Sequence, residues 1–382
     1  MIMTPPEPAT APRPAPSAAS GPATAETLGV RPFSASAARP DAALIAALEA
    51  ARYHPLWDRY QRITPLAPRA KDAPMLWRWS EFEPFVERAA LEVPIEDVER
   101  RAIIMAHPAF NGATQTTANL LGAFTVLNPG ERAVPHRHTA SAIRFATRAE
   151  GAFTIVNGRR CAMASGDLVL TPPMCWHGHI NQSAQRTVWF DAANMPLVCG
   201  LDASFFEPGQ RSDATRSDAA FWEVDEGDER KWAGVGMASA AAAVSGATTA
   251  AQSPKFHYPG VVTRAMLDIA RPGADGAKLL RYINPVGGGA VMPTLDCYAQ
   301  RLTAGATTRA RRNTWNTICL VVNGAGRSCV GAASFEWQRH DVFTIPHWTW
   351  ASHTASSADA DVFLVTDRAL FEQLDLVREE MQ

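Results

Sequence analysis

Two stretches decide the fold and the chemistry of this chain: residues 130–145, GERAVPHRHTASAIRF, and residues 166–181, GDLVLTPPMCWHGHIN. His136 and His138 are two residues apart, so on a β-strand both imidazoles point to the same face. His177 follows a later strand and can meet them inside a barrel. Three neutral imidazoles that leave coordination positions open form a catalytic rather than a structural metal site. The sequence therefore predicts one mononuclear metal on these three histidines.

A His-x-His pair alone is weak evidence, because many such histidines lie on the surface or in a core with satisfied nitrogens. His107 is interpreted in that way. The longer pattern here is more specific and consists of residues at fixed intervals: Gly130, His136, His138, Gly151, Gly166, Pro172, His177 and Asn181. It resembles the paired motifs of the cupin superfamily. The acidic residue that many cupins carry after His-x-His is absent and Arg144 lies nearby, which indicates three histidine ligands without a carboxylate.

Short strand-like runs separated by turn signals begin at about Thr116. They are ANLLGAFTVL, AIRFATR, AFTIVNG, DLVLTPP and RTVWFDA, and strand texture returns after about Gly276. Many short strands at close spacing are typical of a sandwich or a small barrel. The expected fold class is all-β with flanking helices: a bicupin of two tandem double-stranded β-helix (jelly-roll) barrels.

The two strand-rich regions resemble each other, which indicates a duplicated barrel. Residues 166–179 align with 340–353, HDVFTIPHWTWASH, through a shared D-x(4)-P-x(3)-W-x(2)-H skeleton. In the second copy the positions of the three predicted ligands are occupied by other residues, namely Arg311, Asn313 and Ala351. Arginine does not deprotonate to ligate a metal and alanine has no ligand atom. The second barrel is therefore expected to be metal-free, and only His353, the counterpart of His179, persists.

The expected organisation has six parts: a disordered Ala/Pro-rich tail (1–40), a helical N-terminal segment (41–115), the metal-binding first barrel (116–205), a helix-containing linker (206–275), the second barrel (276–366) and a C-terminal helix (367–382). The tail buries too little apolar surface to offset its ordering entropy. Apolar spacing predicts helices over residues 41–52, 79–92 and 95–107, and acidic residues lead the last, as the helix dipole favours.

Composition excludes several classes of partner. The 382 residues are 47% hydrophobic with a formal net charge of −2, which suits a large core and disfavours nucleic acid or an anionic membrane. No apolar run approaches the roughly 20 residues that span a bilayer, and the N-terminus does not resemble a secretory signal. The six cysteines include no CxxC pair and are expected as reduced thiols. A cytoplasmic protein is expected.

Six motifs extend the resemblance beyond the barrel: PLWDRY, MLWRWSEFEPF, ERRAIIMAHP, LNPGERAVPHRHTASAIRF, GDLVLTPPMCWHGHIN and VWFDAANMPLV. From about Pro55 to the C-terminus the chain resembles the gentisate 1,2-dioxygenase family of bicupin ring-cleaving dioxygenases, which includes salicylate and 1-hydroxy-2-naphthoate dioxygenases. The resemblance implies a non-haem Fe(II) enzyme, usually a homotetramer. Its substrates would be O2 and a small aromatic carboxylic acid, opened between the carboxyl-bearing carbon and the adjacent hydroxyl-bearing carbon.

The predicted ligand set suits this chemistry. Three facial histidines leave three positions on an octahedral iron, so a 2-hydroxybenzoate can occupy two and O2 the third. Mn(II) also suits imidazole and oxygen ligands, so the metal in vivo stays open.

The resemblance also implies roles for residues around the metal. Arg144 matches an arginine that helps bind substrate, by a charge-assisted hydrogen bond to the carboxylate; the alternative is an arginine on an outward face. His179 can donate a proton or orient the substrate hydroxyl, but its counterpart His353 favours a structural role about equally. Asp191 can anchor His179 or another group behind the site.

Two further residues are weaker candidates for substrate binding. Arg100 can reach the carboxylate end, with a solvated helix face as the alternative. Trp176 is explained as well by core packing as by a wall of the pocket.

Two departures from the typical gentisate enzyme bear on the substrate. The third ligand lies in WHGHIN rather than WHDH, and TTANLLGAFTVLNPGE lacks the aromatic residue and glutamine expected near the ring. Gentisate and a substituted salicylate both stay open as substrates. Two other functions also stay open: another metal-dependent cupin enzyme, such as an isomerase or a diketone dioxygenase, and a non-catalytic bicupin binding protein.

Overall fold

The computed structural model describes residues 41–209, 237–239, 253–356 and 358–382. It divides into two compact units, one up to Leu66 and one from Ala67 onward. The predicted Ala/Pro-rich tail, residues 1–40, lies outside the described residues. Within the described residues, no helix has both the length and the apolar character needed to cross a membrane.

The N-terminal unit contains two helices: α1 (Ala42–Ala50), which lies within the helix predicted over residues 41–52, and α2 (Leu56–Ile63). The indole Nε1 of Trp57 donates a hydrogen bond to Asp41 Oδ2 at 2.8 Å and ties the two helices together. Seven large apolar side chains of this unit are exposed: Leu44, Tyr53, Leu56, Trp57, Tyr60, Ile63 and Leu66. The unit therefore presents an apolar surface rather than a core of its own.

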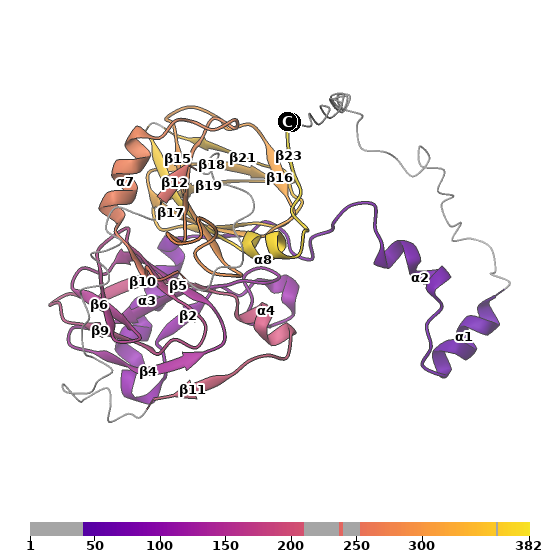
Figure 1. Ribbon diagram of the computed structural model, residues 1–382, viewed down its shortest axis with the longest axis horizontal. Coiled ribbons are helices and arrows are strands. Elements are labelled where there is room, and N and C mark those ends of the chain that lie inside the picture. The colour runs from indigo at the N-terminus through magenta and orange to yellow at the C-terminus, as the bar shows by residue number, and fades with distance from the viewer. Residues whose placement is uncertain (1–40, 210–236, 240–252, 357) are drawn as a thin grey trace, which may run out of the picture. The chain divides into compact units, whose positions relative to one another are not determined.

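The first barrel is formed by two antiparallel sheets of the larger unit (Figure 1). One sheet has the strand order β13 (His257–Tyr258), β8 (Leu168–Thr171), β5 (Ala142–Arg148), β10 (Thr187–Ala193), β3 (Leu121–Leu127) and β2 (Ala102–Ile104). The other has the order β11 (Phe206–Pro208), β4 (Arg132–His138), β9 (His177–Asn181), β6 (Ala152–Val156) and β7 (Arg159–Met163).

The second barrel repeats this arrangement. Its larger sheet has the order β1 (Leu76–Trp77), β20 (Val342–Ile345), β17 (Thr317–Asn323), β22 (Ala360–Thr366), β15 (Asp296–Leu302), β14 (Lys278–Tyr282) and β12 (Met237–Ser239). Its smaller sheet has the order β19 (Ala333–Gln338), β18 (Ala325–Val330), β21 (Ala351–Ala355), β16 (Arg311–Asn313) and β23 (Glu379–Met381). The prediction of two tandem barrels is confirmed.

The two barrels share one hydrophobic core between the sheets that contain β5 and β17. Ile143 and Phe145 of β5 belong to this shared core together with Ile318 of β17, while Ala146 of β5 belongs to the core inside the first barrel. Phe145 stacks on Phe363 with ring centroids 4.2 Å apart. Alternate side chains of one strand thus enter two different cores, which explains why these strands are apolar on both faces.

Helices close the edges of this framework. They are α3 (Trp79–Glu92), α4 (Met195–Gly200), α7 (Gly260–Ile269) and α8 (Arg368–Gln373). Val86 and Ala90 of α3 and Leu267 of α7 are buried in the shared core. The helix predicted over residues 79–92 is therefore confirmed, as is a helix within the predicted linker.

Three expectations about secondary structure are corrected. The helix predicted over residues 95–107 is wrong: a 3₁₀ turn, Ile95–Asp97, is followed by β2, because the β-branched Ile103 packs on the shared core as part of a strand. The C-terminal helix ends at Gln373, and the last residues form β23 on the edge of β16. The linker also supplies β11, β12 and β13, which extend the sheets of both barrels.

Candidate metal centre

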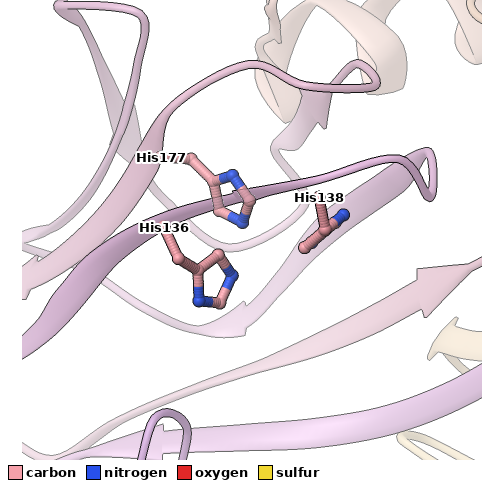
Figure 2. A group of neighbouring side chains, drawn as sticks. All are labelled: His136, His138 and His177. Atoms are coloured by element: carbon pink, nitrogen blue, oxygen red, sulfur yellow. The ribbon is translucent and has the colours of Figure 1, made fainter. Parts of the chain in front are cut away.

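The three predicted ligands converge in the first barrel, as Figure 2 shows. His136 on β4 lies directly opposite His177 on β9, and His138 follows two residues along β4. The ring centroids of His136 and His177 are 4.5 Å apart, and the centroid of His138 lies 5.3 Å from the first and 4.9 Å from the second. One ligand nitrogen from each ring lies within 4.8 Å of the other two. This spacing fits a single metal ion.

Hydrogen bonds to backbone carbonyls orient two of the three rings. His138 Nδ1 lies 2.9 Å from the carbonyl oxygen of Ala140, and His177 Nδ1 lies 3.0 Å from that of Cys175. A proton on Nδ1 in each ring leaves the Nε2 lone pair for a metal. The Nε2 of His177 is buried and has no hydrogen-bond partner in the described residues. An unsatisfied nitrogen in this position is costly unless a metal binds it, so the residues present fit the expected ion.

The histidines are held in the neutral form that binds metal. Burial lowers the pKa of His136 and His177 well below the ordinary value, and the charges of Arg100 and Arg144 lower it further. Burial and Arg144 lower the pKa of His138 to about 4. At neutral pH a metal therefore has no proton to displace from these rings.

Arg144 lies inside the first barrel and is paired with Asp191. The two residues are opposite each other on β5 and β10, with Arg144 Nε 3.4 Å from Asp191 Oδ1. Arg144 is 4% exposed and also donates to the hydroxyl of Thr171. The hydroxyl of Thr125 and the indole of Trp189 donate to Asp191. Asp191 thus fixes the guanidinium, whose remaining donors are available for an anion.

Arg100 reaches the histidines from the loop that precedes β2. Its Nη2 lies 3.2 Å from His136 Nε2, and its Nη1 donates to the carbonyl oxygens of Glu99 and Val134 at 2.6 and 2.8 Å. Burial and the charge of Arg144 lower its pKa to about 9, so it stays charged at neutral pH. The alternative that Arg100 lies on a solvated helix face is wrong, because Arg100 lies in a loop between a 3₁₀ turn that ends at Asp97 and the strand β2.

His179 is buried in the same barrel but does not join the ligand group. Its Nδ1 lies 3.0 Å from the hydroxyl of Thr154, and its ring centroid lies 6.2 Å from that of His177. The side chain of Asp191 contacts Arg144, Thr125 and Trp189. The expected contact between Asp191 and His179 is not among the described hydrogen bonds. In the second barrel, His353 Nδ1 makes the same contact with the hydroxyl of Ser328 at 2.8 Å. A contact common to both barrels favours a structural role.

Trp176 lies on the opposite side of the strand pair from the ligands. The guanidinium of Arg137 is 5.0 Å from the centre of the Trp176 ring. Arg137 stands between His136 and His138 on β4, so its side chain points to the other face. The contact with Arg137 therefore does not support Trp176 as a wall of the pocket.

Phe206 is a residue near the site that the sequence did not reveal. It lies on β11, opposite His138, and its ring centroid is 5.1 Å from that of His136. Because β11 belongs to the region expected as a linker, local sequence pattern gave no signal for this pairing. A pair of adjacent phenylalanines, Phe205 and Phe206, directly after the first barrel was the available clue.

Known proteins resemble both the sequence and the structure. Residues 123–193 match the family model described as Cupin domain. The chain is 35% identical to 5-aminosalicylate 1,2-dioxygenase of Comamonas sp., in an alignment that covers 85% of this chain and 86% of that protein. It is 33% identical to gentisate 1,2 dioxygenase 1 of Aquipseudomonas alcaligenes, in an alignment that covers 87% of this chain and 94% of that protein. The chain belongs to the gentisate 1,2-dioxygenase family.

A solved structure of this family has the same fold. Salicylate 1,2-dioxygenase from Pseudoaminobacter salicylatoxidans, in a structure of its adducts with gentisate, is 30% identical, with a TM-score of 0.80 over 91% of this chain and 96% of that chain. As a member of the gentisate 1,2-dioxygenase family, the chain is an aromatic ring-cleaving dioxygenase. This finding decides against the isomerase and the non-catalytic binding protein.

In this member of the gentisate 1,2-dioxygenase family, the second barrel aligns with the first as the sequence repeat predicted. Arg311 on β16 lies directly opposite Ala351 on β21, as His136 lies opposite His177. His353 lies opposite Ser328, as His179 lies opposite Thr154. The equivalence of the two sites thus rests on strand register as well as on sequence.

Proposed function

We propose that this chain uses Fe(II), held by His136, His138 and His177, to open the ring of a 2-hydroxybenzoate-type acid with O2. The cleaved bond joins the carboxyl-bearing carbon and the adjacent hydroxyl-bearing carbon. The observation that carries the proposal is the convergence of three neutral imidazoles with two guanidiniums, those of Arg100 and Arg144. The chemistry that bound Fe(II) would supply is activation of O2 beside a chelating aromatic acid.

The electrostatics of the site support an anionic chelating substrate. The three ligands are neutral, so the metal keeps its full positive charge. Arg144 adds a buried positive charge whose position Asp191 fixes, and Arg100 adds a second on the side of His136. Both arginines are proposed to bind the substrate carboxylate, because the planar guanidinium matches a carboxylate in two parallel hydrogen bonds.

The substrate class is proposed as gentisate or a substituted salicylate. Relatives act on gentisate, 5-aminosalicylate and 1-hydroxy-2-naphthoate, to judge by their names. These acids share a carboxylate next to a ring hydroxyl, the pair of oxygens that a metal with two open positions chelates. His179 is proposed as a group that orients the substrate or supplies a proton, with packing against Thr154 as the alternative.

Oxygen uptake tests this proposal. The protein is loaded with Fe(II) without oxygen, and uptake is measured with gentisate, salicylate, 5-aminosalicylate and 1-hydroxy-2-naphthoate. Benzoate and 4-hydroxybenzoate serve as controls, because each lacks the hydroxyl next to the carboxylate. Uptake with a 2-hydroxy acid and none with the controls is expected. If no 2-hydroxy acid supports uptake, the proposed substrate class is wrong; loading with Mn(II) in parallel tests the metal.

The assembly is proposed to be a homotetramer, as the family resemblance implies. The apolar surface of the N-terminal unit supports association, because exposed patches of this kind commonly mark interfaces. Light scattering coupled to size-exclusion chromatography measures the mass directly. A mass equal to that of one chain of 41.3 kDa would contradict the tetramer.

A further inference from the structure

One of the three proposed ligands lacks the hydrogen bond that orients the other two. His138 and His177 each direct Nδ1 at a backbone carbonyl oxygen, at 2.9 and 3.0 Å. The Nδ1 of His136 is buried and has no hydrogen-bond partner among the described residues. Histidines that bind a metal through one nitrogen almost always donate the other N–H to a carboxylate, a carbonyl or water. The ring of His136 thus requires an acceptor that its own strand does not provide.

The contact with Arg100 fixes which nitrogen of His136 carries the proton. Arg100 Nη2 lies 3.2 Å from His136 Nε2, and a guanidinium has donors but no acceptor. In the neutral ring Nε2 is therefore the acceptor, and Nδ1 carries the proton. The same tautomer offers its Nε2 lone pair to a metal. A buried N–H without an acceptor is costly, so a partner is expected on the Nδ1 side of the ring.

Glu99 is an acidic residue on that side. Its Oε2 lies 3.9 Å from His136 Nδ1, which is a short side-chain movement away from a hydrogen bond. The Glu99 side chain is half exposed, and its carboxylate accepts no hydrogen bond from a described residue. The carboxylate is therefore free to move toward the ring.

The loop that carries Glu99 is held against the ligand strand. Arg100 Nη1 donates to the carbonyl oxygen of Val134 on β4, two residues before His136, at 2.8 Å. Before the loop, Ile95 is buried in the core of the first barrel, and after the loop β2 pairs with β3. The backbone is thus anchored on both sides, and only the Glu99 side chain needs to adjust.

The ring of Phe206 is a weaker candidate for the same N–H. Its centroid lies 5.1 Å from that of His136, with the two ring planes at 66°. An aromatic face accepts an N–H far more weakly than a carboxylate does. It also carries no negative charge that would make the imidazole a stronger base.

We propose that Glu99 is a positioning residue for the metal centre, whose carboxylate accepts the Nδ1 proton of His136. The hydrogen bond fixes the orientation of the ring, and the negative charge makes its Nε2 a stronger ligand. Two consecutive residues thus serve opposite sides of one imidazole, Glu99 at Nδ1 and Arg100 on the side of Nε2. The inference rests on the proposed three-histidine site, but it requires neither the proposed substrate nor ring cleavage.

Affinity for Co(II) tests the proposal without substrate or oxygen. Competition with a chromogenic chelator gives the dissociation constant for Co(II) in each variant. Glu99→Ala is expected to weaken binding about ten- to a hundredfold, as is usual when such an outer carboxylate is removed. Glu99→Gln keeps an acceptor oxygen and should lose less. Glu96→Ala removes an exposed glutamate from the neighbouring 3₁₀ turn and should bind normally.

Proton resonances of the Co(II) protein report on the hydrogen bond itself. Paramagnetic Co(II) shifts the Nδ1 protons of its histidine ligands away from the other resonances, so one exchangeable signal is expected for each of the three rings. In Glu99→Ala one signal should exchange faster with water, because the His136 proton has lost its acceptor. The other two, from rings bonded to backbone carbonyls, should persist.

Three results would overturn the proposal: equal affinity in Glu99→Ala and Glu96→Ala, equal losses in Glu99→Ala and Glu99→Gln, or unchanged proton exchange in Glu99→Ala. Equal losses would mean that Glu99 acts only through its charge, which also reaches Arg100. Failure of the metal site itself gives a different result. If His136→Ala binds Co(II) as tightly as the parent chain, His136 is not a ligand, and both the proposed site and this role of Glu99 are wrong.

Discussion

Asp191 lies directly opposite Arg144 on neighbouring strands, with its Oδ1 3.4 Å from the Arg144 Nε. This pair joins the barrel wall to the proposed substrate site, because Asp191 forms an ion pair with the guanidinium and accepts hydrogen bonds from Thr125 and Trp189. The carboxylate itself does not contact the three histidines in any described hydrogen bond. Asp191 is therefore a positioning residue, and its effect should pass through Arg144.

Asp191→Asn is expected to lower kcat/KM by about ten- to a hundredfold, since the buried Arg144 guanidinium loses the carboxylate that it is paired with. The loss should fall mainly on KM, because a misplaced Arg144 weakens substrate binding. Arg144→Lys should show a similar loss, since lysine lacks the fork that matches a carboxylate. Arg137→Lys, on the opposite face of β4, is the matched control. Unchanged KM in Asp191→Asn with normal iron content would contradict this role.

His177→Ala is expected to reduce bound iron to below about a tenth of the wild-type level. The residue is one of the three proposed ligands, and its Nε2 is buried without a hydrogen-bond partner among the described residues. Metal analysis of purified protein after anaerobic loading measures the effect. His353→Ala removes a buried histidine from the second barrel and should leave iron content unchanged. Equal iron in both variants would show that the metal lies elsewhere.

His353 makes the stability of the protein depend on pH. Burial and the charge of Arg311 lower its pKa to about 4, from an ordinary value of 6.5. Below pH 6.5 the unfolded chain therefore binds a proton that the folded chain does not bind until about pH 4. The free energy of unfolding should fall across this window as pH falls, by roughly 3 kcal/mol from this residue.

His353→Gln should remove that contribution. The variant is expected to lose less stability than the parent chain between pH 7 and pH 4, although its stability at pH 7 is lower through the lost contact with Ser328. Denaturant titrations of metal-free protein at four or five pH values give, for the parent chain and for the variant, the slope of the free energy of unfolding against pH. Parallel slopes would mean that His353 titrates normally in the folded protein.

The stack of Phe145 on Phe363 predicts that the two barrels unfold together. Phe363→Ala should destabilise the protein by about 3–5 kcal/mol, as is usual for a buried phenylalanine. Calorimetry should show one transition moved to lower temperature. Phe205→Ala changes a side chain that is 68% exposed and should have an effect within about 0.5 kcal/mol. Two separated transitions in the parent chain would contradict coupled unfolding.

The sequence could predict the parts of the site that depend on strand periodicity. His136 and His138 share a face, and Arg144 lies inside the barrel, as the period of two required. The equivalence of Arg311 and Ala351 to two of the ligands also followed from the repeat. The same rule, applied to Trp176 beside His177, would have placed its ring on the outer face.

Other parts depend on contacts between distant segments, which local pattern does not encode. Arg100 was assigned to a helix because acidic residues and apolar spacing suggested one, whereas pairing with β3 turned the following residues into a strand. Phe206 reaches His136 only because β11 adds to the edge of β4. The C-terminal strand formed for the same reason, since the edge of β16 offered a partner.

The strands whose side chains alternate between two cores have an evolutionary consequence. Phe145 of the first barrel stacks on Phe363 of the second and would face water if the second barrel were absent. A duplicated copy that becomes the neighbour's inner wall is free to lose its catalytic residues, but deleting it would expose an aggregation-prone surface. The second copy can therefore lose or exchange its catalytic residues, but it cannot be deleted, because the enzyme needs it to stay soluble.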